Sequence, residues 1–301
     1  MAFDLFLLEV IVTGLLAGVM YALVALGFVL IFKASGVFNF AQGVMCLFAA
    51  LTLAGIMEKT GWPAWVAIPL TIGVMIALAW LIERLVLRHL INQDPIILFM
   101  ATIGLAYVLE GSGDIIWGSD VKVLDIGLPQ GAVDWLLDTH NFYIEKLEIF
   151  AAVIAAVLVG VLAIFFQKTR IGRALRAVAD DHQAALSVGI SLRTIWVIVW
   201  SVAGIVALVA GVVWGTKSGV QFSLSLIALK ALPVLILGGF TSIPGAIVGG
   251  LIIGVGEKLA EVYMGPLVGG AVENWFAYML ALAFLLIRPQ GLFGEKIIER
   301  V

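Results

Sequence analysis

Long runs without a charged residue dominate the pattern of hydrophobic and polar positions along this chain. They lie at residues Val10–Phe32, Ala34–Met57, Thr60–Ile82, Pro95–Leu109, Ile149–Gln167, Thr194–Thr216, Ala231–Gly256 and Asn274–Ile287. Lipid offers no hydrogen-bond partner to the backbone, so segments that cross it in this way must be helical. Because about 20 apolar residues cross roughly 30 Å of hydrocarbon, the pattern predicts an all-α, polytopic transmembrane bundle of about eight spans. We expect a single domain over residues 1–301.

The composition excludes an ordinary water-soluble domain. Hydrophobic residues make up 63% of the 301 residues and charged residues 12%, whereas soluble domains contain roughly 45–50% and roughly 25%. A net charge of −3 without a long basic run does not favour nucleic-acid binding. One cysteine and three scattered histidines can build neither a disulfide framework nor a His/Cys metal site.

Lysine and arginine gather in segments that we expect to be cytoplasmic. The segment 168–193 holds five of them against two acids, whereas 120–148 holds six acids against two lysines. We therefore expect a cytoplasmic loop at about 168–193, an extracytoplasmic loop at about 118–148 and an outside N-terminus. The basic C-terminus looks cytoplasmic, so one run must fail to cross simply. The run Ala231–Gly256 is interrupted by the glycines and proline of Gly238–Gly245, which predicts two half-helices forming a hairpin.

Several glycines recur at a spacing of four residues. They are Gly14, Gly18, Gly245, Gly249, Gly250 and Gly254. Such pairs let helix backbones approach closely where lipid gives no hydrophobic drive. Packing within the chain is the favoured interpretation, and a subunit interface is the alternative.

Ionisable residues are absent from the middle of the well-defined runs. Glu257 and Lys258 are expected to follow a helix end, too exposed to couple transport to an ion. No GxxxxGK[ST] phosphate loop, Ser/His/Asp arrangement or zinc-ligand spacing occurs. We therefore do not expect an enzyme, and any energy for transport must come from elsewhere.

Two amides stand between glycines in the segment Gly36–Gly43. Asn39 and Gln42 lie three residues apart, which places both on one side of a helix break at the membrane surface. They could line a pathway or gate, or they could cap helix ends and satisfy freed backbone groups.

The segment Gly172–Ile190 lies in the expected cytoplasmic loop. Leu175, Val178, His182 and Leu186 recur at helical spacing, and Gly189 can end the helix. Asp180 or Asp181 can cap its second part. A short helix on the cytoplasmic face suits the groove of a soluble partner, and a plain basic loop is the alternative.

These two segments, together with Leu237–Gly250 and Arg288–Gly294, closely resemble the permeases of branched-chain amino acid ABC importers. The resemblance covers nearly the whole chain and is nearest to the shorter of the two paired permeases. It implies an importer with a second related permease, two cytoplasmic ATPase subunits and an extracytoplasmic solute-binding protein, in a bacterial or archaeal cytoplasmic (inner) membrane. It also implies no cofactor in this chain, since the partner ATPases bind ATP and Mg.

The resemblance further assigns roles to individual residues. Coupling to an ATPase subunit falls on Arg173, Arg176, Ala177, Asp180, Ala184, Ala185 and Gly189. A zwitterionic amino acid needs polar groups along its path, for which the chain offers Asn39, Gln42, Thr241, Ser242 and the unpaired backbone near Pro244. The acidic segment 120–148, with Trp117 and Trp135 beside it, could seat the binding protein or could be a solvated loop.

Two alternatives remain open from the sequence. Relatives of this family carry urea, short amides or other small polar solutes, and selectivity resides mostly in the binding protein. A self-sufficient channel or facilitator for a neutral solute also suits the missing ion-coupling residues, but it leaves the basic, alanine-rich loop without a purpose. The sequence also leaves open whether the permease pair is a homodimer or a heterodimer.

Overall fold

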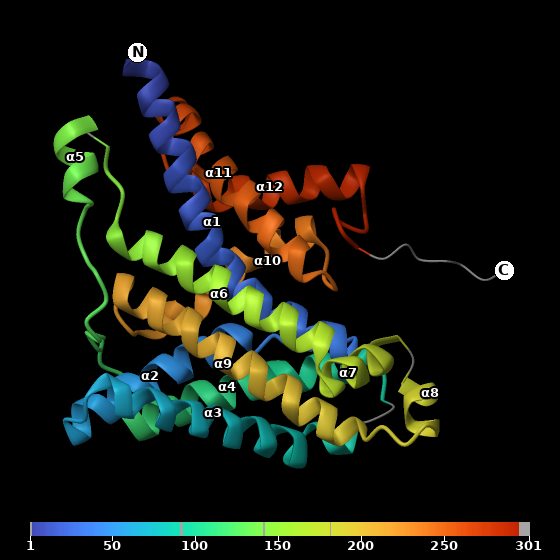
Figure 1. Cartoon of the computed structure of the whole chain (residues 1–301). Helices are drawn as coiled ribbons and strands as arrows, with labels where there is room; N and C mark the ends of the chain where they lie inside the picture. The colour runs from blue at the N-terminus through green and yellow to red at the C-terminus, as the bar shows by residue number, and fades with distance from the viewer. Residues whose placement is uncertain (1, 91–92, 141, 181, 295–301) are drawn as a thin grey trace. The chain divides into compact units, whose positions relative to one another are not determined.

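The computed structural model describes residues 2–90, 93–140, 142–180 and 182–294 and is helical, as predicted (Figure 1). Within these residues the α-helices are α1 (Ala2–Ser35), α2 (Gln42–Thr60), α3 (Ala64–Leu85), α4 (Pro95–Trp117), α5 (Asp134–His140), α6 (Lys146–Lys168), α7 (Arg170–Asp180), α8 (His182–Ser187), α9 (Leu192–Ser218), α10 (Ile227–Gly238), α11 (Ile243–Val268) and α12 (Val272–Ile287). Two short 3-10 helices, η1 (Leu87–Leu90) and η2 (Phe222–Leu226), precede α4 and α10.

Seven helices in the described part of the chain are long and apolar enough to cross a membrane. They are α1, α2, α3 extended by η1, α4, α6, α9 and α11. Two shorter apolar segments, Phe222–Gly238 and Val272–Ile287, accompany them. The prediction of an all-α polytopic bundle is thus confirmed, and the predicted eight spans become seven long helices and two short segments.

The interrupted run forms an antiparallel helix pair. It divides at Gly239–Ser242 into α10 and α11, as the glycines and the proline predicted. Gly238 lies against Gly245, and Gly249 lies against the Val234 carbonyl, so the two helices run in opposite directions. The expectation of two half-helices was wrong for α11, which has 26 residues. It reaches this length because Ser242 and Pro244 start a new helix and the next proline, Pro266, lies near its far end.

The backbone divides into two compact units. Unit 1 comprises Met1–Ala25, Gly127–Ala156 and Ala228–Val301, and unit 2 comprises Leu26–Ile126 and Val157–Ile227. Helices α1 and α6 contribute residues to both units. Helix α2 is buried over most of its length inside unit 2, where Gly211 of α9 packs on the Cys46 backbone and Gly55 accommodates the Trp117 ring.

Within unit 1, glycines form a seam between α1 and α11. Gly14 lies against Gly254 and Val255, and Gly18 lies against Gly250. A Cβ atom at any of these four glycines would collide with backbone atoms of the opposite helix. The backbones therefore approach as closely as the four-residue spacing predicts, and these contacts are within the chain.

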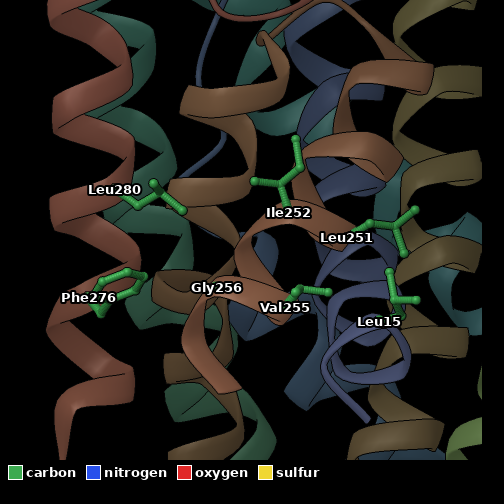
Figure 2. A pocket seen from close by; sticks show the side chains of 7 residues that line it. All are labelled: Leu15, Leu251, Ile252, Val255, Gly256, Phe276 and Leu280. Atoms are coloured by element: carbon green, nitrogen blue, oxygen red, sulfur yellow. The ribbon is translucent and has the colours of Figure 1, made fainter. Parts of the chain in front are cut away.

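An apolar groove of about 410 Å³ lies on α1, α11 and α12 in unit 1 (Figure 2). Its lining residues are Leu15, Leu251, Ile252, Val255, Gly256, Phe276 and Leu280. The lining is apolar throughout, so this groove offers no group that could orient a zwitterion.

Candidate functional site

The helix break in unit 2 separates α1 from α2. Asn39 and Gln42 are both fully buried there. Asn39 Oδ1 accepts a hydrogen bond from the Ala41 amide at 3.1 Å, and Asn39 Nδ2 donates to Gln42 Oε1 at 3.4 Å. Asn39 therefore satisfies the freed backbone, as the capping interpretation expects.

Gln42 differs from Asn39 in its free capacity. Among the described residues, Gln42 Nε2 has no hydrogen-bond partner although it is buried. Gly27 of α1 makes room for this amide, because a Cβ atom at position 27 would overlap it. A buried, unpartnered donor is costly, so Gln42 is the better candidate for a group that faces a transported solute.

Thr102 of α4 completes the same break and was not predicted from the sequence. Its hydroxyl accepts from the Phe40 amide at 3.0 Å and donates to the Phe99 carbonyl at 2.8 Å. The side chain is buried, with an exposed fraction of 2%. The only signal in the sequence was a hydroxyl in an apolar run, which is too common to identify a partner 62 residues away.

The helix break in unit 1 separates α10 from α11. Ser242 caps α11, since its Oγ accepts from the Gly245 amide at 3.1 Å. Thr241 is half-buried, and Pro244 is exposed in the first turn of α11. The pathway candidates thus fall on two breaks, one in each unit.

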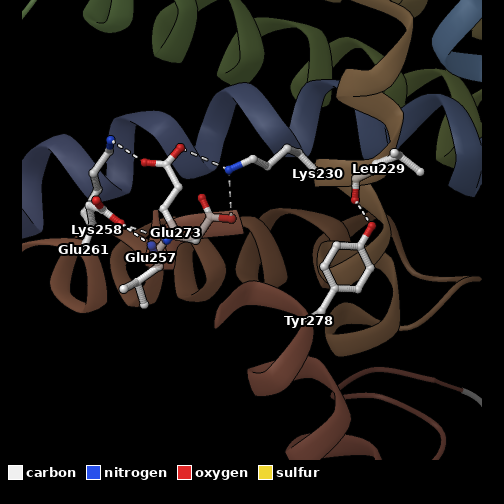
Figure 3. Close-up of polar contacts among 8 residues, drawn as sticks. Leu229, Lys230, Glu257, Lys258, Glu261, Glu273 and Tyr278 are labelled. Atoms are coloured by element: carbon white, nitrogen blue, oxygen red, sulfur yellow. Dashed lines mark hydrogen bonds and ion pairs between the residues drawn. The ribbon is translucent and has the colours of Figure 1, made fainter. Parts of the chain in front are cut away.

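A cluster of charges in unit 1 joins three helices, and we call Lys230, Glu257, Lys258 and Glu273 the charge cluster (Figure 3). Lys230 Nζ of α10 lies 3.5 Å from Glu257 Oε1 and 3.1 Å from Glu273 Oε1. Lys258 Nζ lies 3.3 Å from Glu273 Oε2, and Lys230 Nζ also lies 5.6 Å from the centroid of the Tyr21 ring. Two lysines and two glutamates cancel in formal charge.

The charge cluster shows that the expectation for Glu257 and Lys258 was wrong. Glu257 does not follow a helix end, because α11 continues to Val268, and the exposed fraction of Glu257 is only 1%. The helix can continue through this charge because Lys230 of α10 compensates it. Lys230 and Glu257 are 27 positions apart, so a pattern of neighbouring residues could not predict this ion pair.

Glu261 lies one turn beyond Glu257 on α11 and caps the next helix. Its Oε2 accepts from the amides of Val272 and Glu273 at 2.7 and 2.9 Å (Figure 3). These amides belong to the first turn of α12 and have no acceptor within the helix. A carboxylate at this position also interacts favourably with the helix dipole.

The coupling candidates lie on α7 and α8. Arg173 and Arg176 are exposed and Ala177 is half-buried, whereas Ala185 is 2% exposed. The side chains of Asp180 and Ala184, and all of Asp181, lie outside the part that the structure describes. Gly189 has a left-handed backbone (φ 84°) and follows α8, where its amide donates to the Leu186 carbonyl at 3.0 Å.

Leu175, Val178 and Leu186, which recur at helical spacing, do not all lie on one helix. Leu175 and Val178 are buried on α7, but Leu186 lies on the separate helix α8 and is 48% exposed. The exposed arginines of α7 lie on the face away from Leu175 and Val178. The described part of this loop therefore presents a basic helix followed by a short alanine-containing helix.

The expected extracytoplasmic loop contains the short helix α5. Lys146 Nζ donates to Asp134 Oδ2 at 2.9 Å, and this hydrogen bond lowers the pKa of Asp134. Trp135 is 66% exposed, whereas Trp117 packs on Gly55 inside unit 2. Trp135 is therefore the more exposed of the two tryptophans, since Trp117 is half-buried.

The seven long apolar helices of the described residues are those of a multi-pass membrane protein. The family model described as "Branched-chain amino acid transport system / permease component" matches residues 10–288. The chain belongs to this family.

Curated relatives match over nearly their full length. The chain is 30% identical to the high-affinity branched-chain amino acid transport system permease protein BraD of Pseudomonas aeruginosa, covering 98% of both chains. It is 31% identical to the corresponding permease protein LivH of Escherichia coli K12, covering 99% of this chain and 98% of LivH. A probable branched-chain amino acid transport permease of Methanocaldococcus jannaschii is 29% identical over 90% of this chain and 88% of its own.

Proposed function

We propose that this chain is the permease subunit of an ATP-driven importer for branched-chain or related amino acids in a bacterial or archaeal cytoplasmic (inner) membrane. The observation that carries the proposal is the family match across residues 10–288, with 30% and 31% identity to BraD and LivH. The seven long apolar helices support a chain that crosses the membrane several times.

The energy for import comes from partners in this proposal. The sequence has no GxxxxGK[ST] loop, so ATP and Mg are assigned to two cytoplasmic ATPase subunits and this chain is not an enzyme. A second related permease and an extracytoplasmic solute-binding protein complete the assembly. ATP binding supplies the differential binding energy that a shift between outward-open and inward-open states requires.

The first test is to identify by mass spectrometry what co-purifies with the tagged chain from its native membrane. We expect two ATPase subunits and a related permease, and the matching binding protein should bind leucine, isoleucine or valine. A binding protein that prefers urea or a short amide would keep the importer and change the substrate. A chain that purifies alone after gentle crosslinking would contradict the importer and favour a self-sufficient channel.

Coupling is proposed to run through Arg173 and Arg176 of α7 and the residues that follow them. Reversing both charges (Arg173→Glu with Arg176→Glu) should reduce uptake by about tenfold or more, because an exposed basic face meets its partner through charge complementarity. Arg193→Glu is the matched control, since Arg193 is also exposed in the same loop. Equal uptake by the double variant and the control, at equal membrane insertion, would contradict the docking role.

The pathway proposal separates the two buried amides. Asn39→Ala should lower the unfolding free energy by about 1 kcal/mol, as for a lost cap, with turnover retained. Gln42→Ala should lower turnover instead, because Gln42 Nε2 has no structural partner among the described residues. Uptake per assembled transporter and detergent melting temperature, measured on both variants, decide the matter, and identical behaviour of the two would contradict the distinction.

A further inference from the structure

The segment that follows α12 closes the end of α10. We call Arg288–Gly294 the C-terminal strap. The Leu292 amide donates to the Leu237 carbonyl at 2.8 Å, and the Phe293 amide donates to the Gly238 carbonyl at 3.2 Å. These carbonyls belong to the last two residues of α10, and no amide within the helix donates to them. The strap therefore supplies the donors that a helix end away from water requires.

Glycines on both sides make this contact possible. Gly239 and Gly291 have left-handed backbones (φ 100° and 78°). A Cβ atom at Gly291 would lie 2.8 Å from the Gly239 nitrogen, and one at Gly239 would lie 2.9 Å from the Gly294 nitrogen. Backbone atoms cannot move aside as a flexible side chain can, so both positions need glycine for conformation and for space.

Helix α12 and its strap hold α10 at both ends. Near the start of α10, the Tyr278 hydroxyl donates to the Leu229 carbonyl at 2.6 Å (Figure 3), and Glu273 pairs with Lys230. At its other end, the strap reaches the break that contains Thr241 and Ser242. Backbone hydrogen bonds therefore connect the segment after α12 to the end of α10 that borders this break.

We propose that the C-terminal strap is a positioning element for translocation, which fixes the break Gly239–Ser242 to α12 so that both move together. This proposal rests on the proposed function, which by itself gives no role to Arg288–Gly294. Loosening the strap should let ATP be hydrolysed without a matching movement of the break. The expected defect is uncoupling rather than loss of assembly.

The test compares Gly291→Ala with Gly269→Ala in the complete transporter, reconstituted in liposomes with its binding protein. Both glycines have left-handed backbones (φ 78° and 90°), but nothing lies within 4 Å of a Cβ atom at Gly269. The control therefore carries the same backbone strain without touching the break. We expect Gly291→Ala to lower leucine uptake per ATP hydrolysed by about fivefold or more, with the control close to the parent.

A second readout does not depend on the substrate. Ile243→Cys places a thiol at the first residue of α11, and the native Cys46 is fully buried. The rate at which N-ethylmaleimide labels this introduced thiol should change on ATP addition when Ile243→Cys is made in the parent or in Gly269→Ala. It should not change when Ile243→Cys is combined with Gly291→Ala. Lower thermal stability of Gly291→Ala with an unchanged ATP response and unchanged uptake per ATP would overturn the proposal.

If Gly291→Ala fails to assemble, replacing Leu292 by its α-hydroxy analogue removes one amide donor without adding bulk and is put through the same two readouts. If the parent transporter does not take up leucine, the proposed substrate fails, while the thiol labelling still decides the role of the strap.

Discussion

Two successive stretches along one face of helix α11 hold unit 1 together by different means. The glycine stretch carries Gly250 and Gly254 and meets α1 backbone to backbone. The charged stretch, which follows it, carries Glu257 and Lys258, which pair with charges from α10 and α12. In lipid neither stretch gains from hydrophobic burial, so the first relies on close van der Waals contact and the second on opposite charges. The glycine stretch thus tolerates no added atom, and the charged stretch tolerates no unpaired charge.

The charge cluster is stable only as a set. Glu257 is 1% exposed and Lys230 is its cation, while Glu273 has both Lys230 and Lys258. Removing one member leaves a buried charge without compensation, whereas removing a pair leaves neutral groups. The glycine seam has no such coupling, because at each of its glycines the opposite backbone alone leaves no room for a Cβ atom.

The largest effect is expected for Lys230→Met. The unfolding free energy should fall by about 3–5 kcal/mol, because Glu257 loses its cation inside unit 1. Equilibrium unfolding in mixed detergent micelles measures this. Adding Glu257→Gln to Lys230→Met should recover more than half of the loss.

The same substitution at Lys146 is the control for Lys230→Met. Lys146 pairs with the exposed Asp134, and exposed ion pairs contribute little. Lys146→Met should therefore leave the unfolding transition nearly unchanged. Additive losses for Lys230→Met and Glu257→Gln would show that the pair is not what stabilises the charged stretch of α11.

A smaller effect is expected in the glycine stretch of α11. Gly254→Ala should lower the unfolding free energy by about 1–3 kcal/mol, because the added Cβ meets the Gly14 carbonyl and the backbone of Gly18. Gly104→Ala on α4 is the control, since nothing lies within 4 Å of its added Cβ. That control should be neutral or more stable by up to about 1 kcal/mol, because alanine favours the helix. Equal signs for the two variants would contradict backbone contact as the basis of the seam.

The two stretches of α11 also differ in how far the sequence could predict them. The four-residue spacing of Gly250 and Gly254 places them on one helix face, so close packing was predictable from neighbours in the chain. The charge cluster joins residues 27 and 43 positions apart. A glutamate at the end of an apolar run therefore read as the end of a helix, and only the fold shows which lysine compensates it.

The same distinction holds for the two helix breaks. Asn39 and Gln42 were predicted because side-chain amides between glycines mark a break locally. Thr102 and the amides of Leu292 and Phe293 were not, because they reach their breaks from distant parts of the chain. Local patterns thus predicted where the helices stop, and tertiary structure decides what satisfies the freed backbone.

The smallest effect is expected on a different face of α11, at Gly256 beside the apolar groove (Figure 2). An added Cβ atom would lie 3.2 Å from Leu280 Cδ2 and 3.4 Å from Phe276 Cε1. Both are ends of flexible side chains that line open space, so they can move. Gly256→Ala should change the unfolding free energy by less than about 0.5 kcal/mol, since the gain in helix propensity offsets the displaced Leu280. The same micelle unfolding, run beside Gly254→Ala, tests this. A loss as large as that of Gly254→Ala, two residues away, would mean that contact with backbone rather than side chain does not decide which glycines α11 requires.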